Sequence, residues 1–486
     1  MTILRFQKYL FASLFLVAMF LFLIVQAFDV KGQTINKPII KEKSSKYFIN
    51  DFNHYPTPNI LRPQKGATLE DPIFHTNITR ITDAPREAHG EKYDYAFPGY
   101  PKHDIENADG TMLIIQTFSG STWNIWNAKA PYNKIKEIPP SIIGWGRPID
   151  VRWDSKDPDV LYFQMGKFYK YKVSTDKATV LFDFTNVIPP RPGKQYPSCG
   201  QTLQEEGDAS ADSRYWAFNM ICHDPDHSPM WYSEGYVVYD KDYYEKDKGK
   251  IISMIRPNDA NFRVAGFVSM SPSGKYVWIG DNHYLYPRDF SSVRELGFCC
   301  HADMAISTEG REVIFGFKLR PEKKEYWSIM ADLETGEITY LSPIGGPRYH
   351  FSGNSYSTPG WGVVSTYYPQ YPNPEKDWGD HEVFMVELTK RKDPPPRVWR
   401  IAHTHTVFKD GYADAPFAKI NRKGTKIWFG SGWGHSCLDK QPDGTTRHPY
   451  DVYQIDLPQT WYHDLIGSPP PKASILVNPM GETLGR

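Results

Sequence analysis

The stretch DMAISTEGREVIFGF at residues 303–317 combines a short strand, a polar turn with a glycine, and a second strand of β-branched and aromatic residues. The same pattern recurs at residues 104–116, 151–163, 208–218, 268–280, 354–365 and 418–430. A hairpin repeated at such intervals is typical of four-stranded propeller blades and not of helical repeats. The sequence therefore predicts an all-β fold, a seven-bladed β-propeller, with six or eight blades as the alternatives.

Further strands follow most of these hairpins. The segments YWSIMADLETGE at 326–337 and VFMVELTK at 383–390 are predicted third strands, and ITYLS at 338–342 is a predicted fourth strand. Near the C-terminus, DVYQIDLP at 451–458 is a third strand without a successor, whereas NITRITD at 77–83 looks like an isolated fourth strand. We therefore expect the two ends of the chain to share the last blade, which closes the ring and removes exposed sheet edges.

The composition fits a large β-rich protein. The 486 residues include 40 prolines and 15% aromatic residues, which argues against both disorder and a helical bundle. Lys+Arg and Asp+Glu each total 56, so the net charge gives no sign of a nucleic-acid or membrane-surface partner. We expect no nucleic acid and no protein partner, and a monomer.

The N-terminus has the pattern of an export signal. Arg5 and Lys8 precede an apolar run over residues 10–25, and residues 25–27 have the small-residue form of a cleavage site. We expect a signal peptide at 1–27 and a secreted or periplasmic protein, with an uncleaved membrane anchor as the alternative. The expected organisation continues with a polar linker over 28–65, the propeller over 66–467 and a C-terminal tail over 468–486.

Most histidines of the globular part and all five cysteines are predicted on one face of the disc. In a four-stranded antiparallel blade, the loop entering the first strand and the loop joining the second and third strands lie on the same side. The first kind of loop carries His103, Arg147, Arg191, Cys199, Arg263, Cys299, Cys300, His301, His350, His403 and His405. The second kind adds Asn124, Lys167, Tyr169, Cys222, His223, His227, Tyr232, His283, His435 and Cys437. Function concentrates on loops of a rigid scaffold, so we expect the functional site on this face.

One chemistry predicted there is metal binding. His403 and His405 lie on the same side of an extended segment, and His350 or His301 would add a ligand across the central channel. The alternative is a hydrogen-bonded structural pair. The expected ion is divalent (zinc, calcium or manganese), with a structural or a carboxylate-neutralising role. The cysteines offer a second zinc site, for which a disulfide between Cys199 and Cys222 is the alternative.

The other predicted chemistry is acid–base catalysis around an anionic group. His103, Tyr169 and Tyr232 can transfer protons, while Arg147 or Arg191 can hold a carboxylate through a bidentate contact. The sequence thus gives two sets of candidates. The catalytic set is His103, Tyr169, Tyr232 and Arg147, and the substrate-binding set is Asn124, Arg191 and His223.

These residues resemble the propeller-fold polysaccharide lyases, the group that contains oligogalacturonate lyase and the ulvan lyases. The resemblance spans essentially the whole ring and rests on HADMAISTEGREVIFGF from His301, YHFSGNSYSTPGWGVVSTYY from Tyr349 and IAHTHT from Ile401. Similarity to oligogalacturonate lyase implies a base histidine at His301, a metal ligand at His350 and a Gln-x-x-His-x-His group ending at His403 and His405. Arg400 stands at the glutamine position, which is a departure from that pattern.

Similarity to the ulvan lyases implies an early-blade histidine, a tyrosine and an arginine, for which His103, Tyr169, Tyr232 and Arg147 or Arg191 are the matches. A partner histidine expected about twenty residues after the first falls near Asn124 instead. The implied activity is secreted cleavage of a uronic-acid polysaccharide, with ulvan favoured, by β-elimination to 4,5-unsaturated products. An arginine or a metal would neutralise the uronate carboxylate, with His103 and Tyr169 as base and acid in either order.

Two other classes of function stay open. A non-catalytic carbohydrate-binding or scaffold propeller predicts no preference of titratable groups for one face. A glycoside hydrolase needs two carboxylates at a cleft, and the adjacent candidates are Glu205, Glu206 and Asp208. A peptidase with a propeller gate is disfavoured because the sequence lacks the G-x-S-x-G motif.

Overall fold

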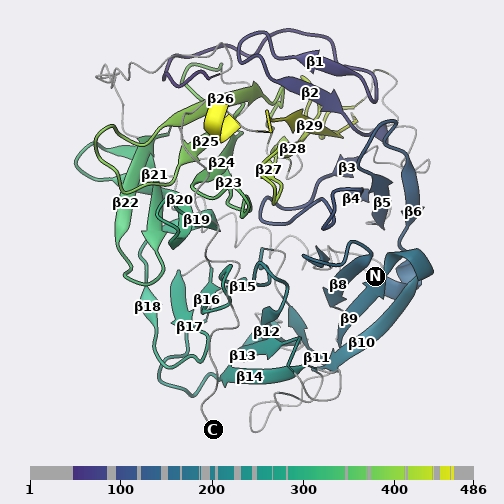
Figure 1. The fold of residues 1–486 in the computed structure, drawn as a ribbon, viewed down its shortest axis with the longest axis vertical. Coiled ribbons are helices and arrows are strands. Elements are labelled where there is room, and N and C mark those ends of the chain that lie inside the picture. The colour runs from purple at the N-terminus through teal and green to yellow at the C-terminus, as the bar shows by residue number, and fades with distance from the viewer. Residues whose placement is uncertain are drawn as a thin grey trace, which may run out of the picture. The chain divides into compact units, whose positions relative to one another are not determined.

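The repeated hairpins form seven antiparallel sheets arranged around a ring, which confirms the seven-bladed β-propeller (Figure 1). The computed structural model describes residues 48–84, 95–117, 122–143, 151–164, 167–184, 187, 198–202, 206–223, 231–243, 249–264, 266–280, 283–344, 349–367, 369, 374–409, 411, 414–440, 442, 449–459 and 461–464. In six sheets the strands follow one another in chain order, so each of these blades is a simple meander.

The first three blades come from the N-terminal half of the chain. Blade 1 contains β3 (Ala96–Phe97), β4 (Met112–Thr117), β5 (Thr122–Asn127) and β6 (Lys134–Glu137). Blade 2 contains β7 (Arg152–Trp153), β8 (Val160–Gln164), β9 (Lys167–Lys172) and β10 (Lys177–Asp183). Blade 3 contains β11 (Ser198–Thr202), β12 (Tyr215–His223), β13 (Trp231–Asp240) and β14 (Lys250–Ile255).

The next three blades continue around the ring. Blade 4 contains β15 (Val268–Met270), β16 (Tyr276–Ile279), β17 (Tyr284–Pro287) and β18 (Arg294–Glu295). Blade 5 contains β19 (Cys299–Ile306), β20 (Glu312–Arg320), β21 (Glu325–Asp332) and β22 (Ile338–Pro343). Blade 6 contains β23 (Tyr349–Ser352), β24 (Trp361–Thr366), β25 (Glu382–Glu387) and β26 (Val398–His403).

The ring closes in blade 7, where the two ends of the chain share one sheet. This blade contains β27 (Lys419–Ile420), β28 (Lys426–Ser431), β29 (Asp451–Asp456), β2 (Asn77–Arg80) and β1 (Thr68–Glu70). The N-terminal strand β2 pairs antiparallel with the C-terminal strand β29, as the sequence predicts. The outermost strand β1 is an addition that the sequence does not predict.

A buried carboxylate fastens this closure. Asp451 of β29 accepts hydrogen bonds from Arg80 Nε at 3.0 Å, from Thr82 Oγ1 at 2.5 Å and from the backbone N–H of Ala84 at 2.9 Å. Arg62 also donates to the same carboxylate. One fully buried acidic group at the C-terminal end therefore gathers partners from several N-terminal positions, which fixes the register of the shared blade.

The blades are held together by apolar packing between neighbouring sheets. In blade 6 the two middle strands are covered on both faces, and every residue of β24 and β25 is buried. Phe315 of blade 5 and Val364 and Phe384 of blade 6 belong to one such interblade core. In the opening turn of blade 5, Gly310 has a φ of 74°, a conformation that side chains disfavour, and its N–H donates to the Ser307 carbonyl oxygen.

Part of the segment expected to be a linker instead packs against the propeller. We call residues 48–65 the N-terminal strap. Ile49 forms an antiparallel bridge with Arg400 of β26, and the Trp433 indole N–H donates to the Ile60 carbonyl oxygen at 3.0 Å. An outer strand presents unpaired backbone groups, and an extended strap can satisfy them. The expected signal peptide (1–27) and C-terminal tail (468–486) lie outside the described residues.

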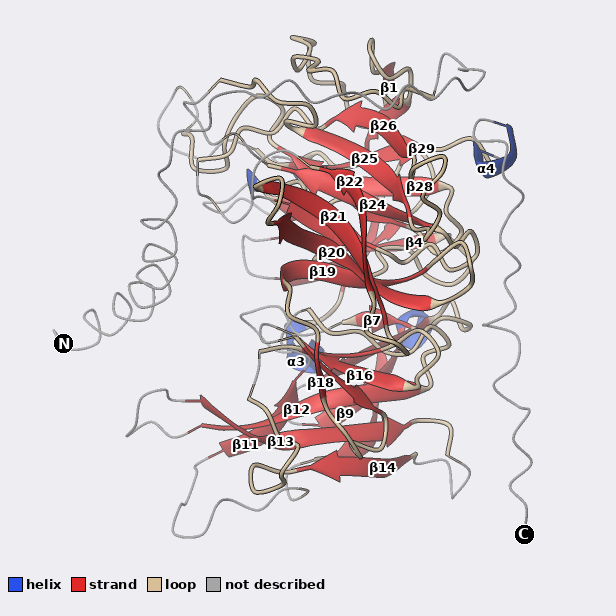
Figure 2. Ribbon diagram, turned by 90° about the vertical axis from the view of Figure 1, so that its left-hand side faces the viewer, coloured by secondary structure: helices blue, strands red, loops and turns tan. Residues whose placement is uncertain are grey.

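Helix contributes little to the described residues. The helical elements with described bounds are the short α3 (Pro140–Ile143), α4 (Trp461–Asp464) and 3-10 turn η1 (Val173–Thr175), and the edge-on view shows the strands filling the blades (Figure 2). Within the described part of the chain, we find no helix with the length and apolar character needed to cross a membrane.

Candidate functional site

Charged side chains from several blades meet at the central channel. They come from the inner segments of blades 1, 3 and 5, which carry Lys102 and Asp104, Glu206 and Asp208, and His301 and Asp303. We use the name channel-mouth cluster for five residues, namely Tyr100, Lys102, Glu206, His301 and His350.

A chain of hydrogen bonds runs through this cluster. The Tyr100 hydroxyl lies 2.7 Å from Nδ1 of His301 and also hydrogen-bonds to the Glu206 carboxylate. An ionised carboxylate only accepts, so the hydroxyl donates to Glu206 and the Nδ1–H of His301 donates to the hydroxyl oxygen. This assignment places the lone pair of the His301 imidazole on Nε2. Tyr100 thus selects the tautomer in which His301 can act as a base.

Lys102 is the positive centre of the mouth. Its ammonium group is buried, lies 2.7 Å from the Glu206 carboxylate, and lies 3.7 Å from the centre of the Phe267 ring. Burial alone would raise the pKa of Glu206, but the charge of Lys102 and the hydrogen bonds from Lys102 and Tyr100 hold it below its usual range. Burial lowers the pKa of His301, and the charge of Lys102 lowers it further against the opposing effect of Glu206. His301 is therefore a neutral imidazole at neutral pH.

His350 lies against His301 in an aromatic wall. The centres of the two imidazole rings are 4.9 Å apart, and the ring of His350 also packs on Phe417 at 4.4 Å and on Tyr367 at 4.9 Å. Burial, assisted by the charge of Lys102, holds the pKa of His350 well below its usual value. His350 is thus a second neutral imidazole beside His301.

Two carboxyl groups below the mouth have raised pKa values. Burial raises the pKa of Asp208 to about 6, against the charge of Arg152, whose Nε lies 3.5 Å from the carboxylate. Burial raises the pKa of Asp303 to about 7, against the charge of Lys102 and hydrogen bonds from the backbone N–H groups of Gly353 and Met304. The carboxyl groups of the channel therefore titrate at different pH values, with that of Asp303 close to neutrality.

Several residues of this face have strained backbones. His301 has a φ of 54°, Phe417 beneath His350 has 48°, and His283, whose pKa burial and Lys102 lower to about 4, has 60°. Such left-handed values are uncommon for residues other than glycine and cluster at functional sites. The strain at His301 accordingly supports a role beyond packing.

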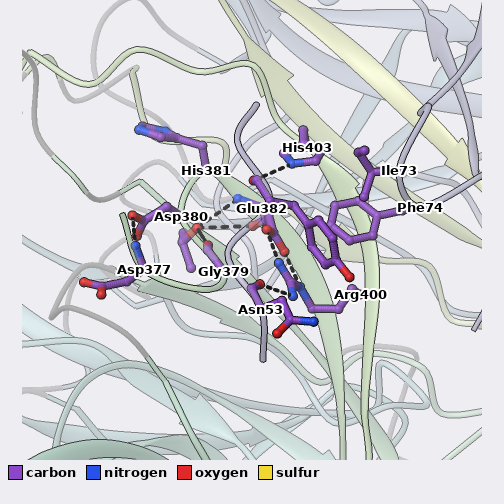
Figure 3. Close-up of polar contacts among 12 residues, drawn as sticks. Asn53, Ile73, Phe74, Asp377, Gly379, Asp380, His381, Glu382, Arg400 and His403 are labelled. Carbon is purple, nitrogen blue, oxygen red and sulfur yellow. Dashed lines mark hydrogen bonds and ion pairs between the residues drawn. The ribbon is translucent and has the colours of Figure 1, made fainter. Parts of the chain in front are cut away.

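A second cluster lies where blade 6 meets the strap (Figure 3). Nδ1 of His403 lies 3.0 Å from an Asp71 carboxylate oxygen, and Nε2 lies 3.1 Å from the Tyr55 carbonyl oxygen. The fully buried Arg400 faces Glu382, donating to it from Nε at 2.6 Å and from Nη2. Burial alone would lower the pKa of His403, but the hydrogen bond and charge of Asp71 raise it. Two buried ion pairs therefore occupy this position.

His103 lies near the mouth, with one ring nitrogen in a hydrogen bond that bears on its predicted role as a base. Its Nε2 accepts a hydrogen bond from Arg152, whose Nη2 also donates to the Gly207 carbonyl oxygen at 2.5 Å. A base needs a lone pair open to the substrate, and the guanidinium group occupies this one. The structure therefore assigns His103 to holding Arg152, a residue that the sequence analysis does not select.

Two other predicted residues lie within the blades. Asn124 is fully buried in β5, where its side-chain N–H group donates to Thr117 Oγ1 at 3.0 Å. Tyr169 lies in β9, and its ring stacks on Phe163 at 4.8 Å within the core between blades 1 and 2. Asn124 is thus held inside blade 1 by hydrogen bonds of its own strand pair, and Tyr169 packs as an interblade aromatic residue.

The remaining candidates are not placed at atomic detail. Arg147 and Arg191 lie outside the described residues, as do the side chains of His223 in β12 and Tyr232 in β13. Cys222 forms a disulfide and faces Cys199 across the ladder between β11 and β12. A zinc thiolate at Cys222 is therefore wrong, because a disulfide sulfur carries no thiolate charge.

The four predicted metal ligands do not form a metal centre. In His403 both ring nitrogens face oxygen acceptors, and in His301 Nδ1 is bonded to Tyr100. His350 and His405 each keep a buried nitrogen without a hydrogen-bond partner, but His405 stacks on Trp433, 4.0 Å away. Across the described ranges no three His, Cys, Asp or Glu side chains are grouped to hold an ion. The residues present do not fit the metal site that the resemblance implies.

The sequence predicts no role for Tyr100, Lys102 or Arg152, and it offers Glu206 only for a hydrolase. A usable signal is the pairs of charged residues two apart, 102/104 and 206/208, close to the strands of a packed core, where charged residues are rare. The partners Asp71 and Tyr55 of His403 carry no local signal, because they lie more than three hundred residues away in the chain.

Comparisons with known proteins agree with this fold. No family model and no curated protein sequence matches the chain. Among solved structures, the chain is similar to an oligogalacturonate lyase in complex with manganese, at 14% identity and a TM-score of 0.53, over 82% of this chain and 97% of that one. It is also similar to the oligogalacturonate lyase of Vibrio parahaemolyticus, at 13% identity and a TM-score of 0.52, over 81% and 97%. The chain therefore has a propeller fold like that of the oligogalacturonate lyases, and the predicted resemblance is confirmed at the level of the fold.

Proposed function

We propose that the channel-mouth cluster catalyses β-elimination at a uronic acid of an acidic polysaccharide or oligosaccharide. The observation that carries this proposal is the hydrogen-bonded chain from Glu206 through Tyr100 to His301, beside the buried ammonium group of Lys102. The C5 proton of a uronate is weakly acidic and sits beside a charged carboxylate. Its removal needs a neutral base and a nearby positive charge, which this cluster supplies.

In the proposed reaction His301 carries out both proton transfers. Nε2 takes the C5 proton, and the electron pair of the C5–H bond forms a double bond between C4 and C5. The bond from C4 to the glycosidic oxygen breaks, and the imidazolium returns its proton to that departing oxygen. Tyr100 and Glu206 hold the neutral His301 ring in the tautomer that has its lone pair on Nε2. Lys102 stabilises the charge that develops on the uronate carboxylate of the substrate. No step is assigned to a metal.

The substrate class follows from the chemistry, and two polymers are the first to test. Ulvan is favoured by the resemblance of the early blades, at His103, Tyr169 and Tyr232, to the ulvan lyases. Galacturonan chains are favoured by the names of the two similar solved structures. We also propose that the enzyme is secreted, on the pattern of residues 1–27.

One observation favours a glycoside hydrolase as the second candidate. Glu206 has a lowered pKa, whereas the pKa of its neighbour Asp208 is raised to about 6 by burial. Two carboxyl groups whose pKa values are pushed apart are the usual basis of acid and base assignments in hydrolases. The lyase is preferred because the carboxylate of Glu206 already pairs with Lys102, and that of Asp208 with Arg152.

The test is to incubate the purified protein with ulvan, pectate and alginate and to record ultraviolet absorbance and reducing ends together. A lyase produces the absorbance of the unsaturated uronate in step with the reducing ends. Reducing ends without absorbance would show a hydrolase, and neither signal on any acidic polymer would count against both enzymes.

A further inference from the structure

We infer that His403 and Arg400 of blade 6 bind the N-terminal strap, so that His403 does not hold a divalent metal, and that Lys102 is the fixed cation of the channel mouth. The first half stands on the contacts of His403 and Arg400. The second half rests on the proposed function, because it names the charge that the elimination uses.

The decisive atom is Nε2 of His403. Metal-bound histidines often donate their other ring nitrogen to a carboxylate, so the contact from Nδ1 to Asp71 fits a metal ligand and a lock equally well. Nε2, however, points at the Tyr55 carbonyl oxygen at 3.1 Å. A carbonyl oxygen only accepts, so Nε2 carries a hydrogen and has no lone pair for a metal. The backbone oxygen of the strap thus occupies the direction that a metal would need.

Arg400 adds a fixed positive charge next to this histidine. Its guanidinium group is fully buried and donates to Glu382, to the Asn53 carbonyl oxygen at 2.9 Å and to the Asp51 carbonyl oxygen at 3.3 Å. The resemblance places a neutral glutamine at this position, whose oxygen could bind a cation. A guanidinium group has no acceptor atom and repels a divalent ion.

The strap is built to satisfy these donors. The carbonyl oxygens of residues 49, 51, 53 and 55 alternate along the chain, and each accepts from blade 6. The first bonds to the Arg400 backbone N–H at 2.8 Å, the next two to its side chain, and the last to His403. Carbonyl groups two residues apart in an extended segment point the same way, so one edge of the strap serves the whole row.

Lys102 supplies positive charge where the reaction is proposed. Its ammonium group lies 2.7 Å from Glu206, over the rings of Phe267 and Trp278 at 3.7 and 4.9 Å. Its charge acts on His301, His350 and Asp303 together. A cation held in a low-dielectric site acts more strongly than one in water and needs no bound ion.

The first test uses the full chain and needs no substrate. The protein is dialysed against a chelator, its metal content is measured, and Mn²⁺ is titrated while binding heat and Tm are recorded. We expect a substoichiometric metal content, no binding heat and an unchanged Tm. A stoichiometric metal content, or a Tm that falls on chelation and recovers with Mn²⁺, would contradict the inference that His403 and Arg400 bind the strap in place of a metal. This outcome is decisive even if no polymer is cleaved and the proposed function fails.

The second test uses Lys102→Met and the charge-preserving control Lys102→Arg on whichever uronate polymer is cleaved. We expect the Met variant to lose about 100-fold in kcat/KM and the Arg variant to retain more activity. Added Mn²⁺ should restore neither. Recovery of Lys102→Met by Mn²⁺, or full activity of that variant, contradicts the fixed cation. If the Met variant does not fold, the wild type is treated with a chelator instead. A loss of its activity that Mn²⁺ reverses would also contradict Lys102 as the fixed cation.

Discussion

The hydroxyl oxygen of Tyr100 lies 2.7 Å from Nδ1 of His301, although the two residues are 201 positions apart in the chain. This contact joins blade 1 to blade 5 across the channel and sets which nitrogen of His301 carries the lone pair. The proposed chemistry depends on that choice, because the other tautomer would present an N–H group to the substrate.

His301→Gln should remove most of the activity. Loss of a positioned base costs about 100- to 10,000-fold in rate, and Tyr100→Phe should cost less because it removes only the tautomer control. The measurement is kcat/KM on the best uronate polymer, with Tm as the check on folding. His463→Gln is the matched control, since His463 lies exposed in α4. Full activity of His301→Gln would mean that another residue is the base.

The pH profile should show the lowered pKa of His301. Burial, assisted by Lys102, keeps the pKa below the usual 6.5, so the base stays neutral at neutral pH and activity falls only as the pH drops below that value. Glu206→Gln removes the charge that opposes this shift, so its acid limb should move to lower pH. Lys102→Met removes a charge that assists the shift, so its limb should move upward. These directions are checked by kcat/KM against pH, and a limb that stays in place in both variants would exclude His301.

Removal of the strap should destabilise the propeller. A chain that begins at residue 58 loses the acceptors of Arg400 and His403, at a cost of about 1–3 kcal/mol for each buried donor left unsatisfied. A chain that begins at residue 48 keeps the strap and is the control. Urea unfolding of the two chains measures the difference. Equal free energies of unfolding would mean that these contacts contribute nothing.

The Asp71–His403 pair should stabilise the fold within a defined pH window. Burial alone would raise the pKa of Asp71, but the hydrogen bond and charge of His403 hold it below its usual value, so the pair is lost as the pH falls through that lowered pKa. His403 has a raised pKa, so its contribution is lost as the pH rises through that value. The Tm difference between wild type and Asp71→Asn should therefore be largest between these limits. A difference independent of pH would argue against the ion pair.

The ring closure should depend on Asp451. Asp451→Ala leaves the guanidinium groups of Arg62 and Arg80 without their shared partner, and breaking a buried ion pair costs about 3–5 kcal/mol. Asp456→Ala is the control on the same strand, because Asp456 is exposed at the end of β29. Chemical denaturation compares the variants. If Asp451→Ala lowers the free energy of unfolding no more than Asp456→Ala does, the contacts of Asp451 do not stabilise the ring closure.

The fold was predictable because its signal is local. Each blade repeats a turn such as that before Gly310 and an apolar strand such as β20, and the unpaired ends at Asn77 and Asp451 indicate the shared blade. These features lie within a few residues of one another, so a pattern in the sequence suffices.

The site was predictable only in part because its partners are distant. Topology places His103 and His301 on one face, but it cannot tell that Arg152 occupies the lone pair of His103 or that Tyr100 frees that of His301. The contacts of His403 could not be predicted for the same reason, since Tyr55 and Asp71 reach it from the other end of the chain. Hydrogen-bond partners across a ring follow from packing and not from periodicity.

The most direct test of the central claim is the mass of the products that wild type and His301→Gln release from the polymer that is cleaved. Elimination leaves one product at each cut lighter by one water than hydrolysis would, because no water is added across the bond. We expect wild type to release these unsaturated products and His301→Gln to release almost none. Products of hydrolytic mass, or unsaturated products at an undiminished rate from His301→Gln, would contradict the account.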